Sequence, residues 1–234
     1  MTRPRSHPRR APLAALAAVL ALGGLALACN DATAPLQMDA YDYKVAVPGA
    51  KGGVDSVAFH WTSADLPVKV WVEDAAGVPA LVQKALDRWG ATIGSGKFRG
   101  TLVGDSTTAD IIVHVAQPPV AEFAVTRLHA LATSCEGAAD VFLDPAQRTI
   151  QRPLRVYVFT SADPAAPDVR ACLDATTTHE IGHTLGLFQH SPNAEDVMYR
   201  LPTTAEPTLH DRATAYFLYR DASGLTAVRS GTPQ

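Results

Sequence analysis

Apolar and polar positions along the chain follow a two-residue period in some segments and a helical period in others. Residues 68–72 alternate apolar and polar side chains, and the β-branched run at 111–115 is typical of a buried strand. Two further apolar runs, at 141–143 and 156–159, predict strands on either side of a turn at 144–147. These segments predict a sheet.

Three other segments predict helices, and in the first of them apolar residues recur at helical spacing. The first starts at Pro79, a residue that suits the first turn of a helix, and ends at one of the glycines that follow Trp89. The second begins near Ala175, and the third covers residues 209–219. We therefore expect one α/β domain (an α+β arrangement), with a twisted mixed sheet, an N-terminal-side helix, a central helix and a C-terminal helix.

The first 28 residues have the layout of a secretory signal. Four arginines in the first ten positions precede an apolar stretch, Ala11 to Ala28, that is short for a membrane-spanning helix. The stretch ends in small residues before Cys29, which resembles the lipobox of bacterial lipoproteins. The resemblance implies cleavage before Cys29 and lipidation of its thiol. An ordinary signal peptide followed by an incidental cysteine is the alternative.

This interpretation divides the chain into four parts. Residues 1–28 are the lipoprotein signal peptide, 29–54 a tether with several prolines and glycines, 55–222 the folded domain and 223–234 a tail. We expect an exported bacterial lipoprotein, in the outer membrane or at the cell surface, facing the periplasm or the exterior.

The composition limits the class of partner. Apolar residues make up 47% of the chain and charged residues 18%, which is enough apolar material for a buried core. The formal charge is −3, and without residues 1–28 it falls to −7, from 16 basic and 23 acidic residues. Such a chain is a poor candidate for binding nucleic acid or an anionic membrane surface. We therefore expect membrane attachment through the lipid alone, and a monomer.

Three cysteines are an odd number for an exported protein. If Cys29 carries the lipid, Cys135 and Cys172 remain, and an oxidising compartment favours a disulfide between them. Sequence does not give the distance between their Cα atoms, on which the disulfide depends.

The segment 179–190, HEIGHTLGLFQH, has the residue types and spacing of a metal site. Residues four apart share one face of a helix, so His179 and His183 can offer nitrogens to one ion. Neutral imidazoles suit zinc, whose catalytic sites keep three protein ligands and one open position. Glu180 lies near the same side, where its carboxylate can act as a general base towards water. Gly186 can adopt a positive φ, so the helix can end there and a third ligand can follow.

These residues resemble the motif of the metzincin zinc peptidases, in particular the matrixin-like members. Their pattern is H-E-x-x-H-x-x-G-x-x-H, followed by a turn that carries a methionine. This chain departs from it by one residue, because Gln189 stands where the family has its third histidine and His190 follows. We assign the third ligand to His190, since a glutamine oxygen is a weak zinc ligand and the spacing from His190 to Met198 fits the family. The resemblance implies that Met198 is the Met-turn residue beneath the metal; a core methionine is the alternative.

The resemblance spans roughly residues 55–220, although the motif itself covers only 179–199. It implies a metzincin-like catalytic domain with one catalytic Zn²⁺, in which Glu180 is the general base and an extended protein or peptide substrate pairs with a sheet edge. Two alternatives stay open. One is a zinc-binding lipoprotein of the same fold that acts as a non-catalytic binding module, and the other is hydrolysis of a non-protein amide. Nothing in the sequence supports a calcium site.

Overall fold

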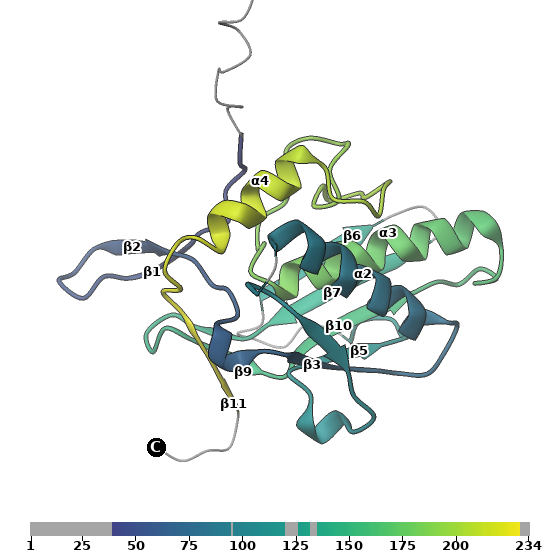
Figure 1. The fold of residues 1–234 in the computed structure, drawn as a ribbon, viewed down its shortest axis with the longest axis horizontal. Helices are drawn as coiled ribbons and strands as arrows, with labels where there is room; N and C mark the ends of the chain where they lie inside the picture. Colours follow the sequence, from purple (N-terminus) through teal and green to yellow (C-terminus); the bar gives the residue numbers. More distant parts are fainter. Residues whose placement is uncertain (1–38, 95, 120–125, 132–134, 230–234) are drawn as a thin grey trace, which may run out of the picture. The chain divides into compact units, whose positions relative to one another are not determined.

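The computed structural model describes residues 39–94, 96–119, 126–131 and 135–229. In this part of the chain it is a mixed α/β fold with a mostly parallel central sheet and three α-helices (Figure 1). The helices are α2 (Val78–Ile93), α3 (Pro167–Thr184) and α4 (Leu209–Leu218), with short 3₁₀ turns η1 (Ser63–Asp65) and η2 (Ser106–Thr108). The strands are β1 (Val45–Pro48), β2 (Val54–Val57), β3 (Val68–Val72), β4 (Gly100–Leu102), β5 (Ile111–His114), β6 (Thr126–Leu131), β7 (Glu136–Val141), β8 (Leu143–Asp144), β9 (Thr149–Arg152), β10 (Leu154–Phe159) and β11 (Thr226–Arg229).

The central sheet has six strands in the order β4-β3-β5-β10-β7-β6. Strand β3 is parallel to β4 and β5, and β10 is parallel to β5. Only β7 runs in the opposite direction, antiparallel to both β10 and β6. The central strands β5 and β10 place Ile111, Val113, Val156 and Val158 in the core with no exposed surface. A continuous apolar run is the pattern expected of buried parallel strands.

Helices α2 and α3 pack against each other over the sheet (Figure 1). The indole nitrogen of Trp89 on α2 donates to the Thr178 carbonyl of α3 at 2.8 Å. The Arg88 guanidinium binds both carboxylate oxygens of Asp174 at 2.6 and 3.1 Å, a bidentate pair that fixes orientation as well as distance. These contacts set the position of α3, and with it the histidines that α3 carries.

Most of the expected elements are present, with two corrections. The single strand predicted at 141–143 spans the junction of two strands, because β7 ends at Val141 and the short strand β8 begins at Leu143. Helix α3 begins at Pro167, well before the predicted start near Ala175. Its first turns carry apolar residues at helical spacing, Val169, Cys172 and Leu173, which the prediction did not use.

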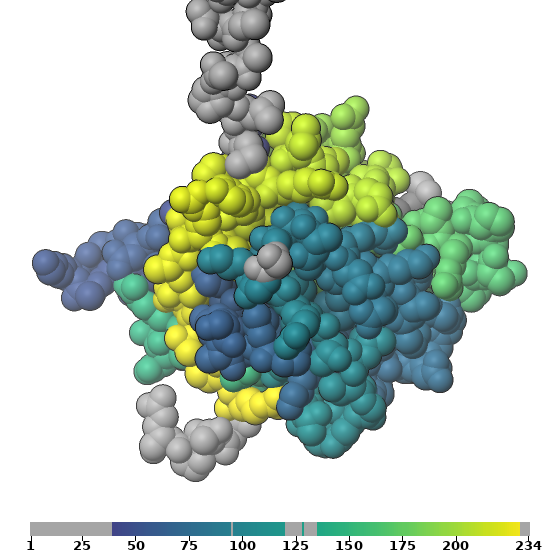
Figure 2. All heavy atoms as spheres, in the orientation of Figure 1, coloured from purple at the N-terminus to yellow at the C-terminus, as the bar shows by residue number. Residues whose placement is uncertain are grey.

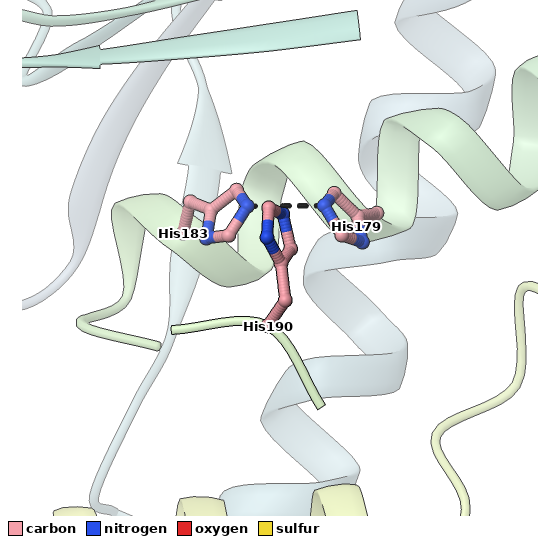
Figure 3. Close-up of side chains that lie close together, drawn as sticks. All are labelled: His179, His183 and His190. Carbon is pink, nitrogen blue, oxygen red and sulfur yellow. Dashed lines mark hydrogen bonds between the residues drawn. The ribbon is translucent and has the colours of Figure 1, made fainter. Parts of the chain in front are cut away.

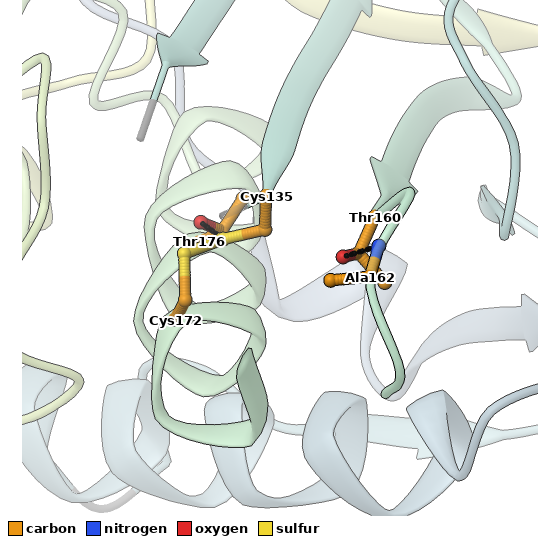
Figure 4. Close-up of a disulfide and its surroundings, with 5 residues drawn as sticks. All are labelled: Cys135, Thr160, Ala162, Cys172 and Thr176. Atoms are coloured by element: carbon orange, nitrogen blue, oxygen red, sulfur yellow. Dashed lines mark hydrogen bonds between the residues drawn. A yellow bond between two sulfur atoms is a disulfide. The ribbon is translucent and has the colours of Figure 1, made fainter. Parts of the chain in front are cut away.

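Cys135, directly before β7, and Cys172 on α3 form a disulfide with their Cα atoms 6.1 Å apart (Figure 4). Cys135 also lies 3.1 Å from the Thr176 hydroxyl, between sulfur and oxygen. The bond joins the start of β7 to the helix that carries His179 and Glu180, so it holds these two elements together.

The folded domain begins earlier than predicted. Part of the expected tether, residues 29–54, lies in the β1–β2 hairpin. The Tyr41 hydroxyl donates to Asp211 at 2.9 Å, and the Tyr41 amide donates to the Thr214 hydroxyl at 3.1 Å. An aromatic side chain with a buried polar partner belongs to a folded domain, so the proline and glycine content here marks a hairpin and not a linker.

The domain also ends later than predicted, because the expected tail, 223–234, includes β11, which pairs in parallel with β9. The signal peptide and Cys29 lie outside the described residues. Among the described residues, no helix is both long and apolar enough to cross a membrane.

Candidate metal centre

Three histidine side chains meet on one side of α3 (Figure 3). His179 and His183 are one turn apart on the helix and have no exposed surface, and their Nε2 atoms lie 3.0 Å apart. His190 approaches from the chain after the helix, with its ring centroid 5.2 Å from that of His179 and 5.1 Å from that of His183. The three nitrogens that could bind a metal all lie within 4.8 Å of one another.

The hydrogen bonds of the two helical histidines select one tautomer. His179 Nδ1 lies 2.7 Å from the Val197 carbonyl oxygen, and His183 Nδ1 lies 2.6 Å from the Leu187 carbonyl oxygen. A carbonyl oxygen can only accept, so each Nδ1 carries the proton and each Nε2 presents its lone pair. Two lone pairs facing each other at 3.0 Å repel one another, and a cation that both can bind relieves that repulsion. The arrangement therefore fits a metal ion.

Burial keeps these imidazoles neutral. It lowers the pKa of His179 to about 3, with a smaller contribution from His190, while the hydrogen bond to Val197 opposes the shift. Burial also lowers the pKa of His183 well below its ordinary value, and the neighbouring imidazoles act in the same direction. Neutral imidazole is the form that binds metal.

These lowered pKa values predict that acid destabilises the metal-free protein. The unfolded chain takes up protons near pH 6.5, whereas folded His179 does so only near pH 3, so stability falls as the pH drops through that interval. The slope is up to about 1.4 kcal/mol per pH unit for each imidazole. Urea unfolding of metal-free protein at several pH values measures it. The variant His179→Gln/His183→Gln should show a shallower dependence, and an equally steep one would contradict the assignment.

The third candidate ligand is His190 and not Gln189. Gln189 is exposed, whereas His190 is partly buried against the other two rings. The chain reaches this point through Gly186, whose φ is +105° and whose amide donates to the His183 carbonyl at 3.1 Å. The extra residue relative to the metzincin pattern is therefore accommodated in the turn between Gly186 and His190.

Replacing these two neighbouring residues one at a time tests the assignment. We expect His190→Ala to weaken zinc binding by at least about 100-fold, because losing a direct ligand costs more than losing its outer hydrogen-bond partner. Gln189→Ala should leave the affinity unchanged, since its side chain points to solvent. Competition with a chromogenic zinc chelator measures both. An equal loss in the two variants would contradict the assignment.

Met198 lies under the same turn of α3. It is fully buried, and a Cβ added at Gly182 would come within 2.5 Å of its sulfur. The helix therefore needs a glycine at position 182 to approach the methionine this closely. Met198 therefore lies beside the helix backbone between His179 and His183. It is not one of the three side chains whose nitrogens lie close together.

Asp211 on α4 holds the segment that contains Met198. Its buried carboxylate accepts hydrogen bonds from the Val197 amide at 2.9 Å, the Met198 amide at 3.3 Å and the Thr208 amide at 2.9 Å. The Val197 carbonyl oxygen accepts a hydrogen bond from His179 Nδ1, so Asp211 helps to position His179 through Val197. In the sequence, an aspartate three residues after a threonine at the start of a helix is a local signal for a capping role of Asp211.

Glu180 is fully buried, and its carboxylate lies against β7 at Gly137. A Cβ at Gly137 would come within 2.5 Å of Glu180 Oε1 and of the Thr176 methyl group. A glycine inside a strand often marks a site where another group approaches the backbone closely. Gly137 was not recognised from the sequence as such a site. The absence of a side chain at Gly137 leaves room for the Glu180 carboxylate.

Comparison with known proteins adds no family assignment. The chain matches no protein-family model, and no curated protein sequence is significantly similar to it. The geometry itself supports one statement: His179, His183 and His190 lie close enough together to bind a metal ion.

Proposed function

We propose that this protein is a zinc-dependent endopeptidase with a metzincin-like catalytic domain. The observation that carries the proposal is the convergence of three imidazoles, the first of which is followed in the chain by a buried glutamate. Met198 beneath the same helical turn supports it independently. A site that only stored a metal would have no use for Glu180.

Zinc fits the donor set. His179 and His183 offer Nε2 lone pairs fixed by their Nδ1 hydrogen bonds, and His190 supplies a third nitrogen. When bound, zinc supplies a Lewis acid that polarises a carbonyl group and makes water a better nucleophile near neutral pH. The protein would hold the ion through these three histidines, which would leave room for water or substrate at the metal.

Glu180 supplies the proton transfers. Its carboxylate accepts a proton from the water that attacks the carbonyl carbon of the scissile peptide bond, and then delivers that proton to the leaving amine nitrogen. Because β7 has no side chain at Gly137, the carboxylate can lie between the strand and α3. The disulfide between Cys135 and Cys172 holds β7 and α3 together beside it.

The substrate we propose is a protein or peptide in an extended conformation. Such a chain binds by adding a strand to an exposed sheet edge. On this side of the central sheet β7 is already paired along its length with β6, and among the residues that the structure describes β6 is the outermost strand, so the proposed edge is β6. A side chain of the substrate would then specify the position of the cut, while the main chain supplies affinity.

Cleavage of an unstructured protein tests the proposal. The mature protein with zinc should cut it, a strong chelator should stop the reaction, and added zinc should restore it. Zinc binding with no cleavage of proteins or of cell-wall peptide amides would favour the alternative, a non-catalytic binding module. Cleavage that persists after complete removal of metal would contradict the proposal.

We also propose that Cys29 is lipidated and anchors the protein to a bacterial membrane. The support is the apolar stretch from Ala11 to Ala28 and the small residues before the cysteine. Mass spectrometry of the N-terminal peptide of the mature protein tests it, and an unmodified thiol at Cys29 would contradict it.

A further inference from the structure

Exposed apolar side chains gather on α4 and the segment leading to it. Leu209 is 81% exposed, Leu201 43%, Tyr216 40% and Phe217 36%, and among the described residues only Val54 is a comparable large exposed hydrophobic. In Figure 2 the yellow residues that include α4 form the upper surface of the domain. We call Leu201, Leu209, Tyr216 and Phe217 the α4 patch.

Exposed basic side chains also lie on α4, just after it and on the segment leading to it. Arg200, Arg212 and Arg220 are all exposed, and the Arg220 guanidinium lies 5.0 Å from the centre of the Tyr216 ring. Two acidic side chains nearby are already paired, Glu206 with Arg88 and Asp221 with Lys44. Aromatic and aliphatic groups flanked by arginines are the composition of surfaces that lie at the boundary between lipid headgroups and acyl chains.

The chain enters the domain beside the same helix. Asp39, Ala40 and Tyr41 line a cavity of about 140 Å³ together with His210 of α4, and Tyr41 is hydrogen-bonded to α4 at Asp211. Asp39 lies ten positions after Cys29, a span of at most about 35 Å when fully extended and about 17 Å on average for a flexible chain. The domain's own radius of gyration is about 16 Å, so a lipid on Cys29 keeps this end of the domain near the bilayer.

We propose that the α4 patch rests on the membrane surface, with its apolar side chains in the headgroup region and its arginines on lipid phosphates. The proposal builds on the proposed lipidation of Cys29. It changes the expectation that the lipid is the only membrane contact: the lipid supplies attachment, and the α4 patch gives the domain one orientation on the bilayer. An acidic net charge does not oppose this, because exposed Arg212 lies on α4 itself, exposed Arg220 follows the end of α4, and exposed Arg200 lies beside Leu201 in the chain.

A fluorophore on the α4 patch tests the contact. The mature lipoprotein carrying Tyr216→Cys is labelled at that position and reconstituted in vesicles of phosphatidylethanolamine and phosphatidylglycerol, some containing brominated acyl chains. Cys135 and Cys172 are bonded to each other and take no label. The matched control carries the label at Thr107→Cys, an exposed position on η2, which lies at the lower edge of the domain in Figure 1, away from α4.

We expect brominated lipid to quench the label at position 216 several-fold more than the label at position 107. Adding Leu209→Glu and Phe217→Glu should remove the difference, because both side chains are exposed and the charges oppose insertion without disturbing the core. Equal quenching at 216 and 107 would overturn the proposal. A label at 216 that is shielded from bromolipid and forms crosslinks between copies would overturn it in favour of an interface with a second copy of the chain.

Discussion

Glu180→Gln is expected to lower the rate of peptide cleavage by at least about 100-fold, and by up to about 10⁴-fold, while zinc binding stays unchanged. Glutamine has nearly the same shape as glutamate, so it fits the space beside Gly137, but it cannot accept the proton from water. Initial rates of peptide cleavage, with zinc content measured on the same samples, check the prediction.

Glu195→Gln is the matched control, because it removes one carboxylate from an exposed loop position of the same domain. It should cleave at the wild-type rate. A Glu180→Gln variant that keeps full activity would refute the general-base role, even if zinc were still required. A variant that loses both zinc and activity would show that Glu180 supports the metal and not only the chemistry.

Gly186→Ala is expected to lower the free energy of unfolding by about 3–5 kcal/mol. A Cβ at this position would lie 1.9 Å from the Phe59 carbonyl oxygen, and the φ of +105° disfavours any residue with a side chain. The obstructing atom is backbone, so relief requires moving either the end of α3 or the chain at Phe59. Because the turn carries the chain to His190, zinc affinity should fall as well. Urea unfolding measures the first effect and chelator competition the second.

Gly90→Ala serves as the control for glycine replacement. Gly90 lies inside α2, and a Cβ there would meet only the Phe98 carbonyl oxygen at 4.0 Å. Alanine favours a helix interior over glycine by about 1 kcal/mol, so this variant should be as stable as the parent or more so. Equal destabilisation by the two substitutions would mean that the close approach at Gly186 is not the cause.

Local rules account for the parts of the site that lie close together in sequence. Helical spacing alone brings His179 and His183 to one face, and the glycine at 186 marks the turn that follows them. The choice of His190 over Gln189 needed ligand chemistry in addition, and the structure brings His190 to the other two rings. The helix carrying these residues was predicted too short, since the helical spacing of Val169, Cys172 and Leu173 was not used.

The contacts of the supporting residues could not be predicted, because these contacts are made across the fold. Asp211 reaches the Val197 and Met198 amides from a different helix, and Gly137 borders Glu180 from a strand. Neither contact produces a periodic pattern of residues in the sequence. The limits of the domain were misjudged for a similar reason, since Tyr41 is held by partners on α4, far along the chain.

The central claim is that His179, His183 and His190 hold a catalytic zinc, and X-ray absorption at the zinc edge tests it most directly. Loaded with one equivalent of zinc, the protein should show three imidazole nitrogen ligands and one oxygen from water, the pattern of a catalytic site with an open position. His190→Ala should lose one nitrogen from that set. A fourth protein ligand closing the site, or a spectrum unchanged in His190→Ala, would contradict the account.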